Sequence, residues 1–412
     1  MFSLNLLSLR IFMLLERHHF HFFGANREMT SLYFTLALLY FAEGLISVFV
    51  PIYFWKLGMP LWQILFFYFL NSLYFLILLL LFIPVLKKLS DKMLMFLSLP
   101  FLILYYFGLG ALENFPSLFY LLPIGLAGNM LFFNTGYHVD FLGASEKGHL
   151  GREIGLRHMV ASLTQFASPF VGGVLIFTFG FGPTFYIGAL LLLLAVLPLF
   201  FFPKRSLSPT LSRGAVWNYL KLNQLMPFTF SGIGFAAEKM VSVILWPLFM
   251  YFALKNIEDF GGIVSVGLLA GAIVTYLIGF LADHGKRRRM IYYSAPVLAV
   301  LWFSRPFFGG ALSIVGSHIA MQIIYSALIV AWSSQYYKIA SSSPDPGSFI
   351  LSREALYHAA RVPFMAAFVL MAFLMPQDAF FASGFIAAGI FTLFFFFANR
   401  MPRHEDIFRA IT

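Results

Sequence analysis

The chain is short of cysteine, of charge in general and of acidic charge in particular. None of its 412 residues is cysteine, which excludes disulfides, thiolate metal sites and thiol redox chemistry. Only 11% of the residues are charged, whereas a soluble domain has about 25%. The 17 acidic residues are outnumbered by 27 basic ones, and the formal net charge is +10. So little charge excludes an ordinary water-soluble domain, and the positive excess has to be explained by where the basic residues lie.

Apolar sequence takes the place of the missing charge, since 60% of the residues are hydrophobic. A helix that spans a membrane needs about 20 mostly apolar residues. The chain contains twelve such runs, and we predict an all-α, polytopic membrane protein. The predicted spans cover residues 31–54, 62–86, 93–111, 117–139, 154–178, 183–202, 226–252, 261–282, 290–308, 311–336, 354–375 and 378–399.

The first 28 residues differ from these spans, because their longest uncharged run after Arg10 is too short to cross a membrane. They lack the basic start and the small-residue cleavage site of a signal peptide. We predict that residues 1–28 lie at the cytoplasmic interface of the membrane, with a disordered start as the alternative. The histidine run within them, residues 17–23, is expected to be interfacial polar sequence or to bind metal adventitiously, and not to be a cofactor site.

The basic residues collect on one side of the predicted topology. With the N-terminus inside, all but four of the 27 fall in cytoplasmic segments, and the exceptions are Lys56, Lys239, Lys255 and Arg305. Lysine and arginine concentrate in cytoplasmic loops, so we predict cytoplasmic termini and a location in the cytoplasmic (inner) membrane. A basic rim has no single positive face, and nucleic acid is not an expected partner. Arg305, near the outer end of its span, is expected to extend to the interface.

The two halves of the chain repeat the same motifs in the same order. Glu43 in FAEGLISVFVP matches Glu238 in FAAEKMVSVILWP, 195 residues later. LSDK and LADH recur at an offset of 192 residues, and GREIGLRH and SREALYH at an offset of 201. Two parallel six-helix halves around a shared site are a transporter plan. We predict bundles over residues 29–203 and 221–401, a cytoplasmic linker over 204–220 and a cytoplasmic tail over 402–412.

One stretch carries a family resemblance. GFLADHGKRRR, residues 279–289, is similar to the signature of the major facilitator superfamily in the loops after its second and eighth spans. Asp91 holds the corresponding place in the first half, and SPFVGG, residues 168–173, is similar to the proline-glycine motif of span five in family exporters. The resemblance extends from about residue 31 to 400. It implies two pseudo-symmetric six-helix bundles around a central cavity.

The repeats also predict a cytoplasmic gate where the two halves meet. Opposite charges there can hold this side shut, and breaking their contacts permits opening. The expected gate residues are Asp91, Arg152, Glu153, Gly279, Asp283, Gly285, Arg287, Arg353 and Glu354. For part of this set helix support is an alternative, since Glu153 precedes Arg157 by four residues.

Two glutamates lie deep in the predicted spans. Glu43 is about twelve residues into the first span, about 18 Å deep at about 1.5 Å per residue, in a core about 30 Å thick. A carboxylate there costs about 2.5–3.5 kcal/mol. Glu238 lies equivalently in the seventh span. The resemblance implies that both helices line the cavity, and we predict both carboxyls as proton-binding groups, with structural acids bonded to neighbouring helices as the alternative.

Other polar residues within the spans are candidates for binding. Lys239 lies about 100° around the helix from Glu238, and it is expected to bind an anionic substrate group or to form an ion pair, with Glu43 or elsewhere. His318, Gln322 and Tyr325 share one face of the tenth span, which suits a proton relay or a substrate contact. The remaining candidates are Asn129, Asn134 and Gln165. Apart from Lys239, for which a structural ion pair is the alternative, these residues could instead serve interhelical hydrogen bonding.

Together these features predict a monomeric secondary active transporter in a lipid bilayer. It moves a small organic solute by alternating access, with protons as the coupling ion. Aromatic residues make up 19% of the chain, which favours an amphipathic substrate, and SPFVGG favours efflux. A uniporter or lipid-type flippase of the same fold and a non-transporting receptor or scaffold are the alternatives. No enzyme motif, cofactor site or metal site is predicted.

Overall fold

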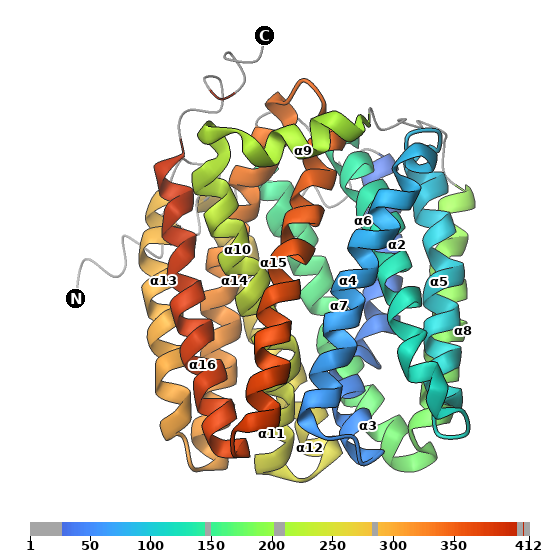
Figure 1. Cartoon of the computed structure of the whole chain (residues 1–412), viewed down its shortest axis with the longest axis vertical. Helices are drawn as coiled ribbons and strands as arrows, with labels where there is room; N and C mark the ends of the chain where they lie inside the picture. Colours follow the sequence, from blue (N-terminus) through green and yellow to red (C-terminus); the bar gives the residue numbers. More distant parts are fainter. Residues whose placement is uncertain (1–26, 145–149, 202–210, 282–286, 402–406, 408–412) are drawn as a thin grey trace, which may run out of the picture.

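The structure is a computed structural model that describes residues 27–144, 150–201, 211–281, 287–401 and 407. Within these residues the chain is helical and has no strand. The long helices stand side by side, and α9 (Arg213–Lys221) lies across one end of them (Figure 1). We call this the α9 end, and the opposite end, where α11 (Trp246–Leu254) lies, the α11 end. The predicted interfacial segment up to residue 26 and the tail from 402, apart from residue 407, lie outside the described residues.

Ten helices of the described residues are long and apolar enough to cross a membrane. They correspond to ten of the twelve predicted spans. The other two are α8 (Phe181–Phe201), which is apolar along its length, and α13 (Arg287–Ser304), which begins with three arginines. The all-α membrane fold is therefore confirmed, and the chain is an integral membrane protein.

The helices form two bundles (Figure 1). The first bundle contains α2 (Arg27–Gly44), η1 (Ser47–Phe49), α3 (Val50–Lys56), α4 (Leu61–Leu86), α5 (Asp91–Ala111), η2 (Pro116–Tyr120), α6 (Leu122–Ala144), α7 (Leu150–Phe179) and α8. The second bundle contains η3 (Asn223–Leu225), α10 (Met226–Met240), η4 (Val241–Leu245), α11, α12 (Ile257–Leu281), α13, η6 (Arg305–Phe307), α14 (Ala311–Ser342), α15 (Pro346–Leu374), α16 (Gln377–Leu393) and η7 (Phe394–Arg400).

The repeated glutamate motif marks a break in the first helix of each bundle. After Glu43, α2 ends at Gly44, and the chain passes through the 3-10 helix η1 before α3 begins. After Glu238, α10 gives way to η4, a five-residue π-helix, and α11 follows. The proline of each motif lies in the first turn of the new helix, where its missing N–H is not needed. Irregular turns of this kind are frequent at functional sites.

The bundles touch along two pairs of helices, α7 with α12 and α4 with α15. On the α7–α12 side, the backbone N–H of Phe170 donates to Ser265 Oγ at 3.1 Å. On the α4–α15 side, the rings of Phe75 and His358 stack with centroids 3.8 Å apart. Close backbone approach on the first side depends on glycine, because a Cβ on Gly261 would overlap the carbonyl oxygen of Pro169.

A glycine-to-alanine pair tests this packing. Gly261→Ala should destabilise the protein by about 1–3 kcal/mol, because overpacking forces the two backbones apart. The next residue supplies the matched control, since a Cβ on Gly262 meets only the Phe170 side chain, at 3.9 Å. Thermal unfolding of both variants in detergent measures the difference, and equal melting temperatures would contradict the close approach.

The linker helix α9 is fastened to the second bundle. Tyr219 Oη lies 2.8 Å from Ser343 Oγ, and the backbone N–H of Ser212 donates to Ser348 Oγ at 2.9 Å. Val216 is fully buried in an apolar cluster that joins α9 to α4 and α15. The helix therefore covers the α4–α15 contact at the α9 end.

Candidate functional site

A cavity of about 600 Å³ lies between the two bundles. The first bundle contributes residues of α2, η1, α6 and α7 to its wall, and the second contributes residues of α10, η4, α11, α12, α14 and α15. This volume suits a small organic molecule. The break after each repeated glutamate opens onto it, since Ser47 of η1 and Ser242 of η4 both line the cavity.

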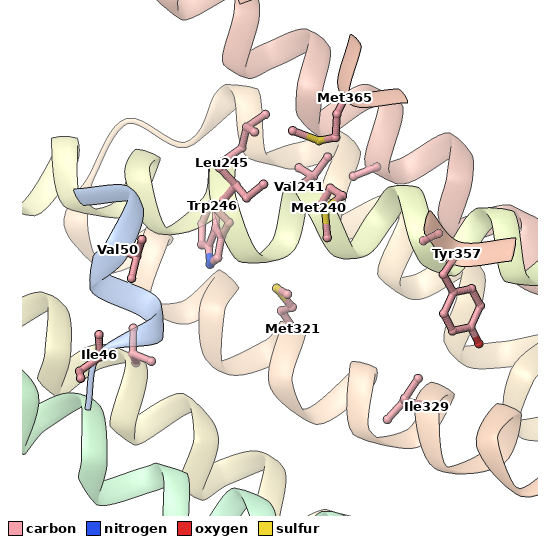
Figure 2. Packing of buried hydrophobic residues seen from close by; sticks show 14 of the residues in the cluster. Ile46, Val50, Met240, Val241, Leu245, Trp246, Met321, Ile329, Tyr357 and Met365 are labelled. Atoms are coloured by element: carbon pink, nitrogen blue, oxygen red, sulfur yellow. The ribbon is translucent and has the colours of Figure 1, made fainter. Parts of the chain in front are cut away.

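One wall of the cavity is aromatic. The Phe235 ring lies 4.9 Å from Trp332 and 5.0 Å from Tyr357, measured between ring centroids, and all three residues line the cavity. Trp246 lines another part of the cavity, where Figure 2 shows it on the side of Met321 of α14. The site therefore offers flat apolar surfaces on which an aromatic or aliphatic group can pack.

The cavity is also basic. Three cationic side chains line it, Lys239 of α10 and Arg353 and Arg361 of α15, against the single carboxylate of Glu354. Arg353 and Glu354 form an ion pair at 2.5 Å, and the Arg353 guanidinium lies 4.0 Å from the centre of the Tyr336 ring. The opposite charges of Arg353 and Glu354 therefore cancel each other.

Lys239 and Arg361 make no ion pair with any described carboxylate. The ammonium of Lys239 lies 5.4 Å above the centre of the Tyr325 ring. Arg361 is 6% exposed, and its Nε has no hydrogen-bond partner. The two side chains are close enough to act on each other electrostatically. The positive charge of the cavity is therefore concentrated on these two residues.

Two hydrogen bonds join the bundles on the side of the cavity nearer the α9 end. Asn134 Nδ2 of α6 donates to Glu354 Oε2 of α15 at 3.0 Å. His138 Nδ1 of α6 lies 2.5 Å from Tyr337 Oη of α14. We call these two bonds the α6 ties.

Aromatic contacts join the bundles at the α11 end. Trp55 of α3 and Phe252 of α11 have ring centroids 4.8 Å apart, and Phe49 of η1 meets Phe260 of α12 edge-on at 5.6 Å. Lys56 of α3 adds a cationic group 6.0 Å from the centre of the Tyr251 ring, so the contacts at this end are mainly aromatic.

Most of the predicted binding residues lie at the cavity. Those that line it are Asn134, Gln165, Lys239, His318, Gln322 and Tyr325. His318 accepts a hydrogen bond from Trp246 Nε1 at 3.1 Å. Asn129 does not reach the cavity, because it faces α5 and donates to the backbone carbonyl of Ser98 at 3.4 Å.

The two repeated glutamates lie elsewhere, and the expectation that both open onto the shared cavity is not met. Neither is among the residues that line it. Glu43 is half-buried and close enough to Tyr106 of α5 to act on it electrostatically. Glu238 is fully buried and accepts a hydrogen bond from Trp302 Nε1 of α13 at 3.3 Å. Each carboxyl therefore faces the interior of its own bundle.

The prediction for Arg305 is wrong. Its side chain is fully buried instead of extending to the interface. The guanidinium lies between the rings of Trp246 and Trp302, 3.6 and 3.8 Å from their centres. Its Nε donates to Ser317 Oγ at 3.2 Å and its Nη2 to Met321 Sδ at 2.9 Å. Aromatic faces and polar atoms inside the bundle thus replace the water that an interfacial arginine would keep.

The predicted gate residues are only partly gathered. Arg353 and Glu354 pair with each other, and Glu354 also accepts a hydrogen bond from Asn134 of the first bundle. Asp91 is fully buried at the start of α5, where its Oδ1 accepts from the backbone N–H of Lys92 at 2.7 Å. Arg287 is half-buried at the start of α13. Arg152, Glu153 and Gly279 lie on described helices without described side chains, and Asp283 and Gly285 lie outside the described residues.

The sequence reasoning missed Arg361 as a site residue and treated it as part of the basic rim. A signal was present, since Arg353, Tyr357 and Arg361 follow at intervals of four residues and so share one face of a helix. Because α15 begins at Pro346, Arg361 lies about four turns from its start.

Two bundles of membrane-spanning helices around a central cavity define the class of solute transporters. The sequence model of the Major Facilitator Superfamily matches residues 142–350, just over half of the chain. The chain belongs to this superfamily, as the resemblance indicated. No protein of curated function matches the sequence significantly.

Solved structures agree with this fold at low sequence identity. FucP in its outward conformation has a TM-score of 0.67 at 13% identity, over 92% of this chain and 100% of that one. The nucleoside transporter NupG has a TM-score of 0.63 at 13% identity, over 90% and 98%. The human organic anion transporter MFSD10 has a TM-score of 0.59 at 13% identity, over 91% and 98%.

Proposed function

We propose that this chain is a secondary active transporter that moves a small organic solute across the cytoplasmic membrane by alternating access. The observation that carries the proposal is the 600 Å³ cavity, which lies between two bundles and presents polar, charged and aromatic side chains amid apolar helices. The bundles meet at both ends of this cavity, so rocking of one bundle against the other can open either end. A fucose:proton symporter, a nucleoside transporter and an organic anion transporter share the fold, which supports a small-molecule substrate.

Protons are the proposed coupling ion, and Glu43 and Glu238 are the proposed proton-binding groups. Each is a carboxyl inside a bundle, next to the break in a cavity-lining helix. The Glu43 carboxyl makes no hydrogen bond or ion pair with another described residue, and a carboxyl withdrawn from water without a partner is most stable when it carries a proton. Gain or loss of that proton changes the charge beside η1, which supplies a link between protonation and cavity shape.

Orientation, oligomeric state and direction of transport are proposed as well. The α9 end is proposed to face the cytoplasm, because the basic residues concentrate in the loops on that side. The chain is proposed to act as a monomer in the lipid bilayer, and export is the favoured direction. The SPFVGG stretch supports a moving interface, since it lies where α7 meets α12.

Reconstituted protein tests the proposal. Proteoliposomes that contain a trapped pH indicator are exposed to a panel of neutral sugars and nucleosides, organic cations and organic anions. At least one solute should evoke proton movement beyond that of empty liposomes, and Glu43→Gln should abolish it, because an amide binds no proton. Proton-driven flux that survives in both Glu43→Gln and Glu238→Gln would instead indicate a uniporter or flippase. Solutes that bind to the protein but are never transported would indicate a receptor.

A further inference from the structure

We infer that the cavity selects an organic anion, whose charged group lies between Lys239 and Arg361 while its apolar part packs on the aromatic wall of Phe235 and Trp332. The inference rests on the proposed function and names the substrate class of the same site. Its starting point is the unbalanced charge of the cavity lining.

The imbalance persists when the charged groups behind the cavity wall are counted. The second bundle places four basic side chains and two carboxylates in and around this region, which leaves two positive charges in excess. They are Lys239, Arg305, Arg353 and Arg361, with Glu238 and Glu354. Desolvated charge without a partner is costly, so an unliganded cavity of this kind favours an incoming anion.

The pairing pattern selects which two cations bind the ligand. Arg353 is paired with Glu354, and Arg305 is enclosed by two tryptophan rings away from the cavity lining. Glu238 is adjacent to Lys239 in sequence, but its carboxylate accepts from Trp302 and makes no ion pair with Lys239. Among the described residues, Lys239 and Arg361 are the cations of the cavity lining that form no ion pair with a carboxylate, although Glu238 and Glu354 act on them electrostatically from farther away.

The chemistry of these two groups specifies the ligand. A guanidinium presents a planar fork of donors that matches a carboxylate or a phosphate, and an ammonium adds a mobile point charge. The Arg361 Nε without a partner is one such donor. Tyr325 and Tyr357 stand beside the two cations, and their hydroxyls can donate further hydrogen bonds to an anionic oxygen.

Matched probes test the charge preference by thermal shift of the full chain in neutral detergent. 1-Naphthoate and 1-naphthyl phosphate should stabilise the protein, and 1-naphthamide, which has the shape of naphthoate without its charge, should bind about tenfold more weakly or worse. Equal stabilisation by acid and amide, or no stabilisation by either anion, overturns the inference. Stabilisation by inorganic phosphate alone to the same extent also overturns it, because the aromatic wall then contributes nothing.

Variants place the anion within the cavity. Lys239→Met and Arg361→Met should each weaken naphthoate binding by about tenfold and leave naphthamide unchanged. Lys56→Met is the control, since Lys56 is an exposed cation outside the cavity lining. Lys239→Arg and Arg361→Lys keep the charge and should keep the preference even where a methionine variant fails to fold. Retained anion binding in both methionine variants overturns the site.

Two further comparisons show whether the bound anion is a lipid or a soluble molecule, and whether a negative result concerns the proposed function or only this inference. Dihexanoyl phosphatidylglycerol, tested against the phosphatidylcholine of the same length, assigns the anionic group to a lipid when it stabilises the protein and the soluble anions do not. The proposed function is tested by flux and this inference by binding. A protein that moves neutral or cationic solutes without preferring anions therefore overturns the inference alone.

Discussion

Asn134→Ala is expected to open the α9 end of the cavity more often. The variant removes the hydrogen bond from α6 to Glu354 and leaves the Arg353–Glu354 ion pair in place. A hydrogen bond to a charged acceptor contributes about 1.5–3 kcal/mol, so the population open at this end should rise about tenfold or more. Adding Tyr337→Phe removes the second of the α6 ties and should increase the effect.

The absence of native cysteine makes this measurement direct. A single introduced cysteine is the only thiol in the chain. Ser333→Cys places it in the cavity lining on α14, where the side chain is 7% exposed. The rate of maleimide labelling should rise in the Asn134→Ala background in proportion to the open population.

Asn129→Ala is the matched control. Both asparagines lie on α6 and both donate through Nδ2, but Asn129 bonds within the first bundle, to the backbone carbonyl of Ser98 of α5. Its removal should lower stability without changing the labelling of Ser333→Cys. Equal labelling in the two alanine variants would contradict the assignment of the α6 ties as the contacts that close this end.

The membrane fold and the internal repeat could be predicted from the sequence, because both depend on local features of the chain and not on which helices are neighbours. Apolar run length identifies a span without reference to any neighbour. The repeated Glu43 and Glu238 motifs marked the two places where a long helix breaks. The cytoplasmic orientation read from the basic residues stays a prediction.

The rotation of each helix about its axis was not predictable in the same way. Glu238 and Lys239 are about 100° apart, and the sequence alone leaves open which of them faces the cavity. The structure turns Lys239 toward the cavity and Glu238 toward Trp302. The neighbouring helices decide which face of a helix is turned toward the cavity. Their positions depend on packing between segments that are distant in the sequence.

The other two errors concern arginines. The eleventh span was predicted from residue 354, which put Arg361 only about two turns from its cytoplasmic end and led to its being counted with the basic rim. In the structure α15 begins at Pro346, so Arg361 lies deeper along the helix. Arg305 was expected at the interface because no single span shows that tryptophans from α11 and α13 enclose it. Trp246 lies 59 residues before Arg305 in the sequence, so its contact with the guanidinium could not be read from the span that holds Arg305.

Arg305→Met is expected to be the most destabilising single substitution considered. The variant removes a buried cation from between Trp246 and Trp302, together with its hydrogen bonds to Ser317 and Met321. It also removes a positive charge that acts on the fully buried Glu238. Loss of one member of a buried charge cluster costs about 3–5 kcal/mol. Denaturant or thermal unfolding in detergent measures the loss.

Arg289→Met is the control for this loss, because Arg289 is an exposed arginine near the start of α13. A surface substitution of this kind should change the free energy of unfolding by about 0.5 kcal/mol or less. A loss in Arg305→Met no greater than this would show that the aromatic enclosure contributes no stability.

A double-mutant cycle with Glu238→Gln separates charge from packing. If Arg305 mainly offsets the carboxylate, the double variant should lose less than the sum of the two single losses, because the amide needs no counter-charge. If the losses add, the guanidinium stabilises the bundle through the tryptophan faces alone, and Glu238 remains free to exchange its proton without unfolding the cluster. The second outcome keeps the proposed proton role of Glu238, whereas strong coupling assigns it a structural one and leaves Glu43 as the proton-binding carboxyl.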